Sequence, residues 1–248
     1  TSDLVALAMA GPMASCGYDD VPNAPPIRGT GKQGYATGCH WGLIGTLAAL
    51  HHRDMTGQGQ YVDASIHEAI SCTTEAAMPI YFYTKKIPMR QTGRHHAVDP
   101  TPRTQWPARD GGLITVFGVP RTQASWATLM EWMEEHGMGQ KLREEPRYQE
   151  AFVGGARSGP DLQLVWEGIG KLISLMDANE AYHGAQRRGY PWGLVRSPEE
   201  TLEDPHLWDR GFFTQVQHPE LNKSYIYPGP PYILNKTPWR TRRATLLG

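Results

Sequence analysis

A glycine-rich run is the first group of residues whose types and spacing could do chemistry. Residues 29–34 read Gly-Thr-Gly-Lys-Gln-Gly, the GxGxxG pattern whose backbone N–H groups can approach a dinucleotide pyrophosphate. That fingerprint needs a strand directly before it, and the preceding residues include the consecutive prolines Pro25 and Pro26, which make a poor strand. We therefore interpret residues 29–34 as a glycine loop that leads into a helix.

Histidines and cysteines could hold a metal, but their spacing argues against it. His51-His52 and His95-His96 are adjacent pairs, and neighbouring side chains in a helix or strand point in different directions. The three cysteines are widely spaced and form no CxxC pair. We expect no metal site and no disulfide, and this cysteine usage favours a reducing, cytoplasmic compartment.

Composition narrows the class of protein without assigning a function. The chain has 248 residues, of which 40% are hydrophobic and 20% charged, with a formal net charge of -1. This balance is typical of a soluble globular protein and gives no reason to expect nucleic acid or a membrane as a partner. No apolar run reaches the roughly 18 residues that a membrane span needs. The chain opens at Thr1 without an initiator Met or a signal-peptide pattern, so we expect it to be part of a longer protein or the product of processing.

Interleaved helical and strand patterns must position these groups. The first part predicts a helix over 1–13, an extended segment over 21–26, a helix over 37–53 capped by Thr37, a strand over 61–64, and a helix over 65–83 with a Ser65–Glu68 capping box and a kink at Pro79. Residues 84–108 are proline-rich and predict a loop and a domain boundary.

The second part repeats this mixture. It predicts a strand over 113–117, a helix over 125–136 with Trp126, Leu129, Met130 and Met133 in the core, helices over 160–176 and 178–188, the latter with an Asp177–Glu180 capping box, helix caps at Ser197 and Asp204, and strands within 211–234. Because helices and strands alternate along the chain, the predicted class is α/β or α+β.

Residues 44–69 carry the most specific pattern in the chain. They contain Leu-Ala-Ala-Leu at 47–50, Arg53, Thr-Gly-Gln-Gly-Gln at 56–60, and Val-Asp-Ala-Ser at 62–65, followed by Glu68. In this order and spacing they resemble the signature of class III CoA-transferases, a family typified by formyl-CoA and carnitine CoA-transferases, with α-methylacyl-CoA racemase as a relative. Other stretches agree, so the resemblance covers essentially the whole chain. It suggests that the chain is the C-terminal two-thirds of such an enzyme.

The resemblance implies an architecture and a set of partners. It implies the C-terminal part of a Rossmann-like large domain with its linker over 1–100, a small α/β domain over 101–195, and a return to the large domain over 196–248, in an interlocked dimer. The upstream portion of the large domain would lie outside this chain. The implied substrates are a coenzyme A thioester and a small carboxylic acid, with no tightly bound cofactor, and the implied protein partner is a homologous or identical subunit.

The residue that would carry the chemistry is not where the resemblance places it. In the family one aspartate attacks the donor thioester and passes through an anhydride to an aspartyl-CoA thioester. Counting back from 47–50 without a gap puts that position at Tyr35, and a one-residue gap moves it to Gly34. Neither side chain can form an acyl anhydride. The resemblance also implies that Tyr35, His40 and Ile66 line the CoA site. The position of His40 in a buried-looking helix start favours a core histidine over a catalytic base.

Three hypotheses remain open. The chain could be a non-catalytic subunit whose sister carries the aspartate. Another carboxylate could act, with Asp3 as a weak candidate, unless it merely caps the first helix, and with Asp19, Asp20 and Glu68 as further ones. Lastly, the protein could be an acyl-CoA racemase or isomerase that removes an α-proton, with Asp3 matching the racemase aspartate.

Overall fold

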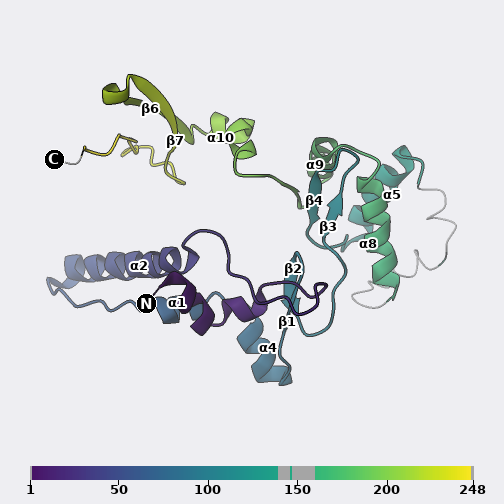
Figure 1. Ribbon diagram of the computed structural model, residues 1–248, viewed down its shortest axis with the longest axis horizontal. Coiled ribbons are helices and arrows are strands. Elements are labelled where there is room, and N and C mark those ends of the chain that lie inside the picture. The colour runs from purple at the N-terminus through teal and green to yellow at the C-terminus, as the bar shows by residue number, and fades with distance from the viewer. Residues whose placement is uncertain (1, 139–145, 147–159, 247–248) are drawn as a thin grey trace. The chain divides into compact units, whose positions relative to one another are not determined.

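The computed structural model describes residues 2–138, 146 and 160–246 (Figure 1). By its internal contacts the chain divides into two compact units, residues 1–193 and 194–248, which are described separately. Helices and strands are interleaved, so the predicted mixed α/β class is confirmed. The interlocked dimer and the three domain ranges stay predictions. No helix in the described ranges is long and apolar enough to cross a membrane.

The first unit opens with helices around a short apolar cluster. They are α1 (Asp3–Met9), the 3-10 turn η1 (Pro12–Ser15), α2 (Gln33–Thr56), α3 (Ile66–Ser71) and α4 (Ala77–Thr84). α1, α2 and α3 contact one another, and Ala6, Leu7, Ala10 and Ile70 form the buried cluster between them. The helix predicted over 1–13 ends earlier because Gly11 adopts φ +105°, a left-handed conformation that suits glycine, directly before Pro12.

The long helix α2 begins before the predicted cap. Thr37 lies inside the helix, where its hydroxyl donates to the Gln33 carbonyl at 2.8 Å, so the cap prediction is wrong. Threonine can make this bond within a helix as readily as it can cap one, which is why its presence did not fix the boundary. The helix ends at Gly57, whose φ of +75° gives the left-handed C-cap that glycine favours.

The segment after α2 also differs from its prediction. Residues 61–64 form no assigned strand, since they lie along α2 instead of pairing with another strand. The helix predicted over 65–83 is divided into α3 and α4 by turns that include Glu75 at φ +49°. This break places Pro79 in the first turn of α4, where a missing N–H is tolerated, so no kink is needed.

A hairpin occupies the stretch predicted as a loop. Strands β1 (Met89–Gln91) and β2 (Arg94–Ala97) pair antiparallel around a turn with Gly93 at φ +62°. The strands are only three and four residues long, and such short pairings leave too little periodicity for a sequence pattern to reveal.

The later part of this unit is built on a three-stranded sheet in the order β3 (Gln105–Pro107), β4 (Leu113–Val116) and β5 (Trp192–Val195). Helix α5 (Gln123–Glu135) precedes α8 (Pro160–Ile173), which contacts β3, and α9 (Ala178–Arg187), which contacts β4 (Figure 1). Leu129, Met130 and Met133 of α5 are buried, as predicted, and Trp126 is half-buried. Trp132 of α5 stacks on Tyr190 at 6.4 Å between ring centroids, and burial raises the pKa of Tyr190 to about 12.

Helix α9 is capped, but not by the predicted residue. Asp177 occupies the N-cap position without a side-chain hydrogen bond to the helix and instead pairs with Arg109 at 3.0 Å. The acceptor is the Asp110 carboxylate, which receives the Ala178 N–H at 3.1 Å. That bond and the one from the Gly112 N–H hold the pKa of Asp110 below its ordinary value.

The second unit contains the predicted C-terminal strands. The 3-10 turn η2 (Glu200–Glu203) leads to α10 (Pro205–Asp209), which is capped by Asp204 as predicted. The predicted cap at Ser197 is wrong: its backbone and side chain contact the Glu200 carboxylate instead. Strands β6 (Phe213–His218) and β7 (Lys223–Pro228) pair antiparallel around the turn η3 (Pro219–Leu221).

Candidate active site

The start of α2 is the point where α1, α2 and α3 meet, and it contains the position that the resemblance marks as catalytic. Gly34 is buried there. A β-carbon added to Gly34 would lie 2.8 Å from Ile70 Cδ1, 3.0 Å from Asp3 Oδ1 and 3.4 Å from Leu7 Cγ. This backbone therefore has no room for a side chain at residue 34, and the carboxylate nearest to it comes from α1.

Asp3 supplies the cap that α2 lacks locally. Lys32 is the N-cap residue of α2 and makes no side-chain cap hydrogen bond. The Asp3 carboxylate accepts the Tyr35 N–H through Oδ1 at 3.0 Å and the Arg28 Nη1–H through Oδ2 at 3.2 Å. Ser2, rather than Asp3, caps α1 by accepting the Val5 N–H at 3.3 Å. A carboxylate at this point also suits the positive end of the helix dipole.

This arrangement bears on Asp3 as a candidate catalyst. Its side chain is only 7% exposed, and each of its two oxygens already accepts a hydrogen bond. A carboxylate nucleophile or base must turn a lone pair toward the substrate. In this arrangement Asp3 organises its surroundings, while Tyr35 is half-buried with its amide fixed by Asp3.

Helix α2 carries a row of small residues along which the returning chain lies. Gly34, Gly38, Gly42 and Gly45 are spaced by four, four and three residues and so share one face. A β-carbon at Gly38 would lie 2.8 Å from Ile66 Cγ1, and one at Gly45 would lie 2.9 Å from a Val62 methyl carbon. Ile66 therefore packs directly against the α2 backbone, one turn beyond Gly34.

Two of the three predicted CoA-contacting residues are close together on α2's surface, and the third is not. Tyr35 is three residues before Gly38, where Ile66 packs, so the two lie on neighbouring parts of the helix surface. His40 is two residues after Gly38, about 200° around the helix axis, and is exposed. The prediction that His40 is buried is wrong, because the buried face of α2 is the one that carries Gly34, Gly38, Gly42 and Gly45, called the glycine face below.

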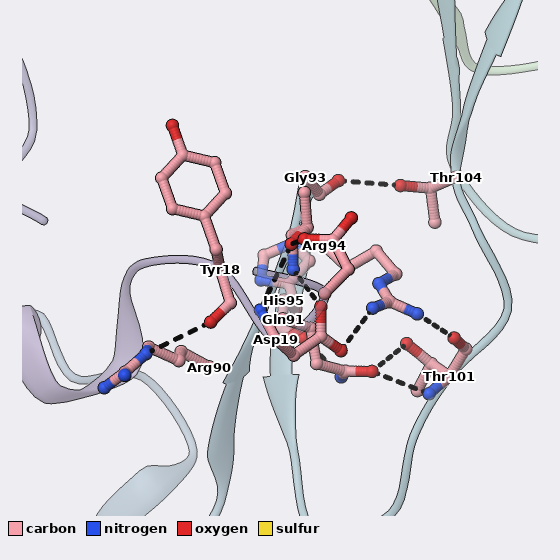
Figure 2. Close-up of polar contacts among 11 residues, drawn as sticks. Tyr18, Asp19, Arg90, Gln91, Gly93, Arg94, His95, Thr101 and Thr104 are labelled. Carbon is pink, nitrogen blue, oxygen red and sulfur yellow. Dashed lines mark hydrogen bonds and ion pairs between the residues drawn. The ribbon is translucent and has the colours of Figure 1, made fainter. Parts of the chain in front are cut away.

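The other candidate carboxylates have different surroundings. Asp19 Oδ1 accepts the Thr92 N–H at 2.8 Å, and Arg94 joins Asp19 to the Thr101 carbonyl (Figure 2). Asp20 accepts the Thr92 hydroxyl. The Thr92 amide, with its hydroxyl and Arg94, holds the pKa of Asp19 below its ordinary value. These groups fasten the segment after η1 to the β1–β2 hairpin.

Glu68 is placed differently again. It lies exposed in the first turn of α3, where its N–H donates to the Ser65 hydroxyl at 3.3 Å. This contact is one half of the predicted capping box.

Metal-binding clusters are absent from the part of the chain that the structure describes: no group of three or more histidines, cysteines or acidic residues is arranged there around a possible ion.

Sequence reasoning missed two features of this site. Arg28 was not predicted as a site residue, because its place beside α2 depends on the contact with Asp3, which lies 25 residues away. The glycine face was also missed, although its spacing was a readable signal of close backbone approach. Asp3 was named as a candidate, but its partners lie 25 and 32 residues away, and no local pattern indicates them.

Comparison with known proteins gives a consistent result. The succinyl-CoA:mesaconate CoA-transferase of Haloarcula hispanica is 29% identical over 246 residues, which is 99% of this chain and 57% of that protein. The succinyl-CoA–L-malate CoA-transferase beta subunit of Chloroflexus aurantiacus is 32% identical over 90% of this chain and 52% of its own length. A crystal structure of a CaiB/BaiF family protein from Brucella suis shares the fold, with a TM-score of 0.68 at 17% identity over 96% of this chain and 57% of that one.

The chain thus spans just over half the length of these relatives. The family model for CoA-transferase family III matches residues 1–245, and the chain belongs to that family.

Proposed function

We propose that the protein containing this chain transfers coenzyme A from an acyl-CoA thioester to a free carboxylic acid. The observation that carries the proposal is the match to CoA-transferase family III along residues 1–245. Because the relatives are described as succinyl-CoA-dependent transferases, succinyl-CoA is the first donor to test. Mesaconate, L-malate and D-citramalate are the first acceptors.

The α1–α2–α3 junction would form one wall of the thioester site. Tyr35 and Ile66 lie on adjacent parts of the α2 surface and would contact the acyl-CoA, whereas His40 would reach it only from the other side of the helix. Close backbone packing along the glycine face gives this wall a fixed shape, which a site that orients two substrates requires.

A specific observation favours a second candidate, a non-catalytic subunit in a hetero-oligomeric transferase. Positions 34 and 35 carry no carboxylate, the space beside Gly34 is filled, and each oxygen of Asp3 already accepts a hydrogen bond, one from Arg28 and one from the Tyr35 N–H. The nucleophilic carboxylate would then come from a sister subunit. A division into unlike subunits has a parallel in relatives named as alpha and beta subunits.

Exposed apolar residues on α2 support a missing protein partner. Trp41, Leu43, Ile44 and Leu47 are each about half exposed or more, and a helix that is apolar on most of its faces is normally buried. We propose that the remaining part of the protein or a homologous subunit covers them, in an assembly that works in the cytoplasm.

The experiment is isotope exchange with the whole protein, prepared with any subunit that co-purifies. Acyl-CoA and a panel of labelled carboxylic acids are incubated together, and mass spectrometry follows label entering the acyl-CoA pool. Transfer to at least one acid is expected, and no transfer across a broad panel contradicts the proposal. Solvent deuterium entering the α-carbon without an acceptor acid would instead indicate the racemase or isomerase.

A further inference from the structure

One buried carboxylate fixes a guanidinium beside the start of α2. Asp3 Oδ2 accepts from Arg28 Nη1 at 3.2 Å, and Asp3 Oδ1 accepts from the Tyr35 N–H at 3.0 Å. Since both donors bond to the same carboxylate group, the Arg28 guanidinium lies next to the backbone of residue 35. That is the position to which the family resemblance assigns the reacting group.

The two members of this ion pair differ in burial. The Asp3 side chain is 7% exposed and the Arg28 side chain is 43% exposed. An arginine offers five N–H donors in a planar fork, and within the described ranges only Nη1 of Arg28 has a hydrogen-bond acceptor. Since the side chain as a whole stays 43% exposed, solvent reaches the guanidinium, whose planar fork suits two oxygens of a carboxylate or phosphate.

The backbone that carries Arg28 is anchored at several points. The Arg90 guanidinium donates to the Ala24 carbonyl at 2.8 Å, and the Ile27 N–H donates to the Cys16 carbonyl at 3.2 Å. Pro25 and Pro26 restrict the dihedral angles between these contacts. The guanidinium is therefore held from both its backbone and its tip, so little side-chain freedom is lost when it binds an anion.

The charges around Arg28 favour an anion. Asp3 balances the charge of Arg28. The 24-residue helix α2 directs its positive end toward the same point, because the Tyr35 N–H in its first turn donates to Asp3. An anion that enters here therefore meets the guanidinium and the positive end of the helix dipole together.

We propose that Arg28 binds the carboxylate of the free acid substrate and that Asp3 is the positioning residue that aims it. The proposal rests on the proposed CoA-transferase function and assigns its acid-binding group. Arg28 would hold the acid while the acyl-CoA occupies the wall formed by Tyr35 and Ile66. The anionic phosphates of coenzyme A are the competing ligand for the same fork.

Steady-state kinetics of the whole protein separate these possibilities. Arg28→Gln is expected to raise KM for the acid about 10- to 100-fold, the loss of a charge-assisted hydrogen bond pair, with KM for the acyl-CoA unchanged and kcat altered only a few-fold. Arg28→Lys should raise the acid KM less, because it keeps the charge but not the fork. Lys32→Gln, which removes an equal charge from the same loop, is the matched control and should change the acid KM less than about threefold.

Positioning by Asp3 is tested with Asp3→Asn, which keeps an acceptor for the Tyr35 N–H but removes the charge that holds Arg28. It should raise the acid KM without a matching loss of thermal stability, whereas a merely structural role would lower stability and leave the acid KM unchanged. An Arg28→Gln variant with an unchanged acid KM, a raised acyl-CoA KM, or an effect equal to that of Lys32→Gln overturns the proposal.

A direct measurement of acid binding tests the role of Arg28 separately from the coenzyme A transfer activity. Isothermal titration of the whole protein with the acid alone should show binding that Arg28→Gln weakens and Lys32→Gln does not. If the wild type exchanges no coenzyme A yet shows this pattern, the proposed function fails and the carboxylate site stands. If acid binding is the same in Arg28→Gln and the wild type, the inference fails whatever the activity.

Discussion

Two glycines one turn apart on α2 should respond to the same substitution with different effects on stability. At Gly38 an added β-carbon would lie 2.8 Å from Ile66 Cγ1 and 3.4 Å from Ile66 Cα, so part of the obstacle is backbone. At Gly42 the nearest atom would be Ala64 Cβ at 3.7 Å, an ordinary contact. The two positions share a helix and a face, and differ mainly in the space above them.

The magnitude follows from cancelling the shared contribution. Replacing glycine by alanine inside a helix stabilises it by about 1 kcal/mol at either position. Gly38→Ala additionally forces Ile66 away from α2, and such overpacking costs about 1–3 kcal/mol. We therefore expect Gly42→Ala to be the more stable variant by about 1–3 kcal/mol, with a net gain over the wild type.

Native-state hydrogen exchange of the whole protein measures this difference locally, because peptides from α2 report the opening of that helix. Exchange should slow in Gly42→Ala and should be about 5- to 150-fold faster in Gly38→Ala than in Gly42→Ala. Equal slowing in both variants would show that α2 and the segment around Ile66 are not packed as described, and the proposed wall of the thioester site would lose its basis.

Two other predictions concern the cap of α9 and the exposed face of α2. Asp110→Ala removes the acceptor for the Ala178 N–H, so exchange in the first turn of α9 should become roughly a few-fold faster. The pKa of Asp110 is lowered on folding, so the stabilisation should be fully present above the ordinary aspartate pKa and should be lost as the pH falls through the lowered pKa of the folded protein. Thermal unfolding at several pH values measures this loss, which should be absent in Asp110→Ala. Leu47 is 57% exposed, so Leu47→Lys should leave the circular dichroism of this chain unchanged. It should weaken the assembly of the chain with the covering partner at least about tenfold, since a leucine buried by that partner contributes about 1.5–3 kcal/mol to binding. Size-exclusion chromatography measures that assembly, His51→Lys is the control on the same helix, and an unaffected assembly would argue against a partner on this face.

The sequence allowed the class and most of the longer helices to be predicted, because amphipathic periodicity over a dozen residues is a strong signal. Helix α5 with Leu129, Met130 and Met133 in the core is an example. The predictions that failed rested on short or ambiguous sequence patterns. Thr37 forms a bond within α2 rather than a cap, and Val62 lies against Gly45 rather than in a strand. In such cases tertiary contacts decide between conformations that local energies leave nearly equal.

The helix caps show why part of the site was out of reach of sequence reasoning. The first N–H groups of a helix need acceptors, and this requirement is visible in any sequence. The supplier is not, because Asp3 caps α2 from 32 residues away and Asp110 caps α9 from 68 residues away. At α2 this distant supplier also holds Arg28. One carboxylate closes the helix end with Oδ1 and holds a cation with Oδ2, so it joins the fold to the site. Asp3→Asn separates the two roles because it keeps the acceptor for the helix and removes the charge that holds Arg28.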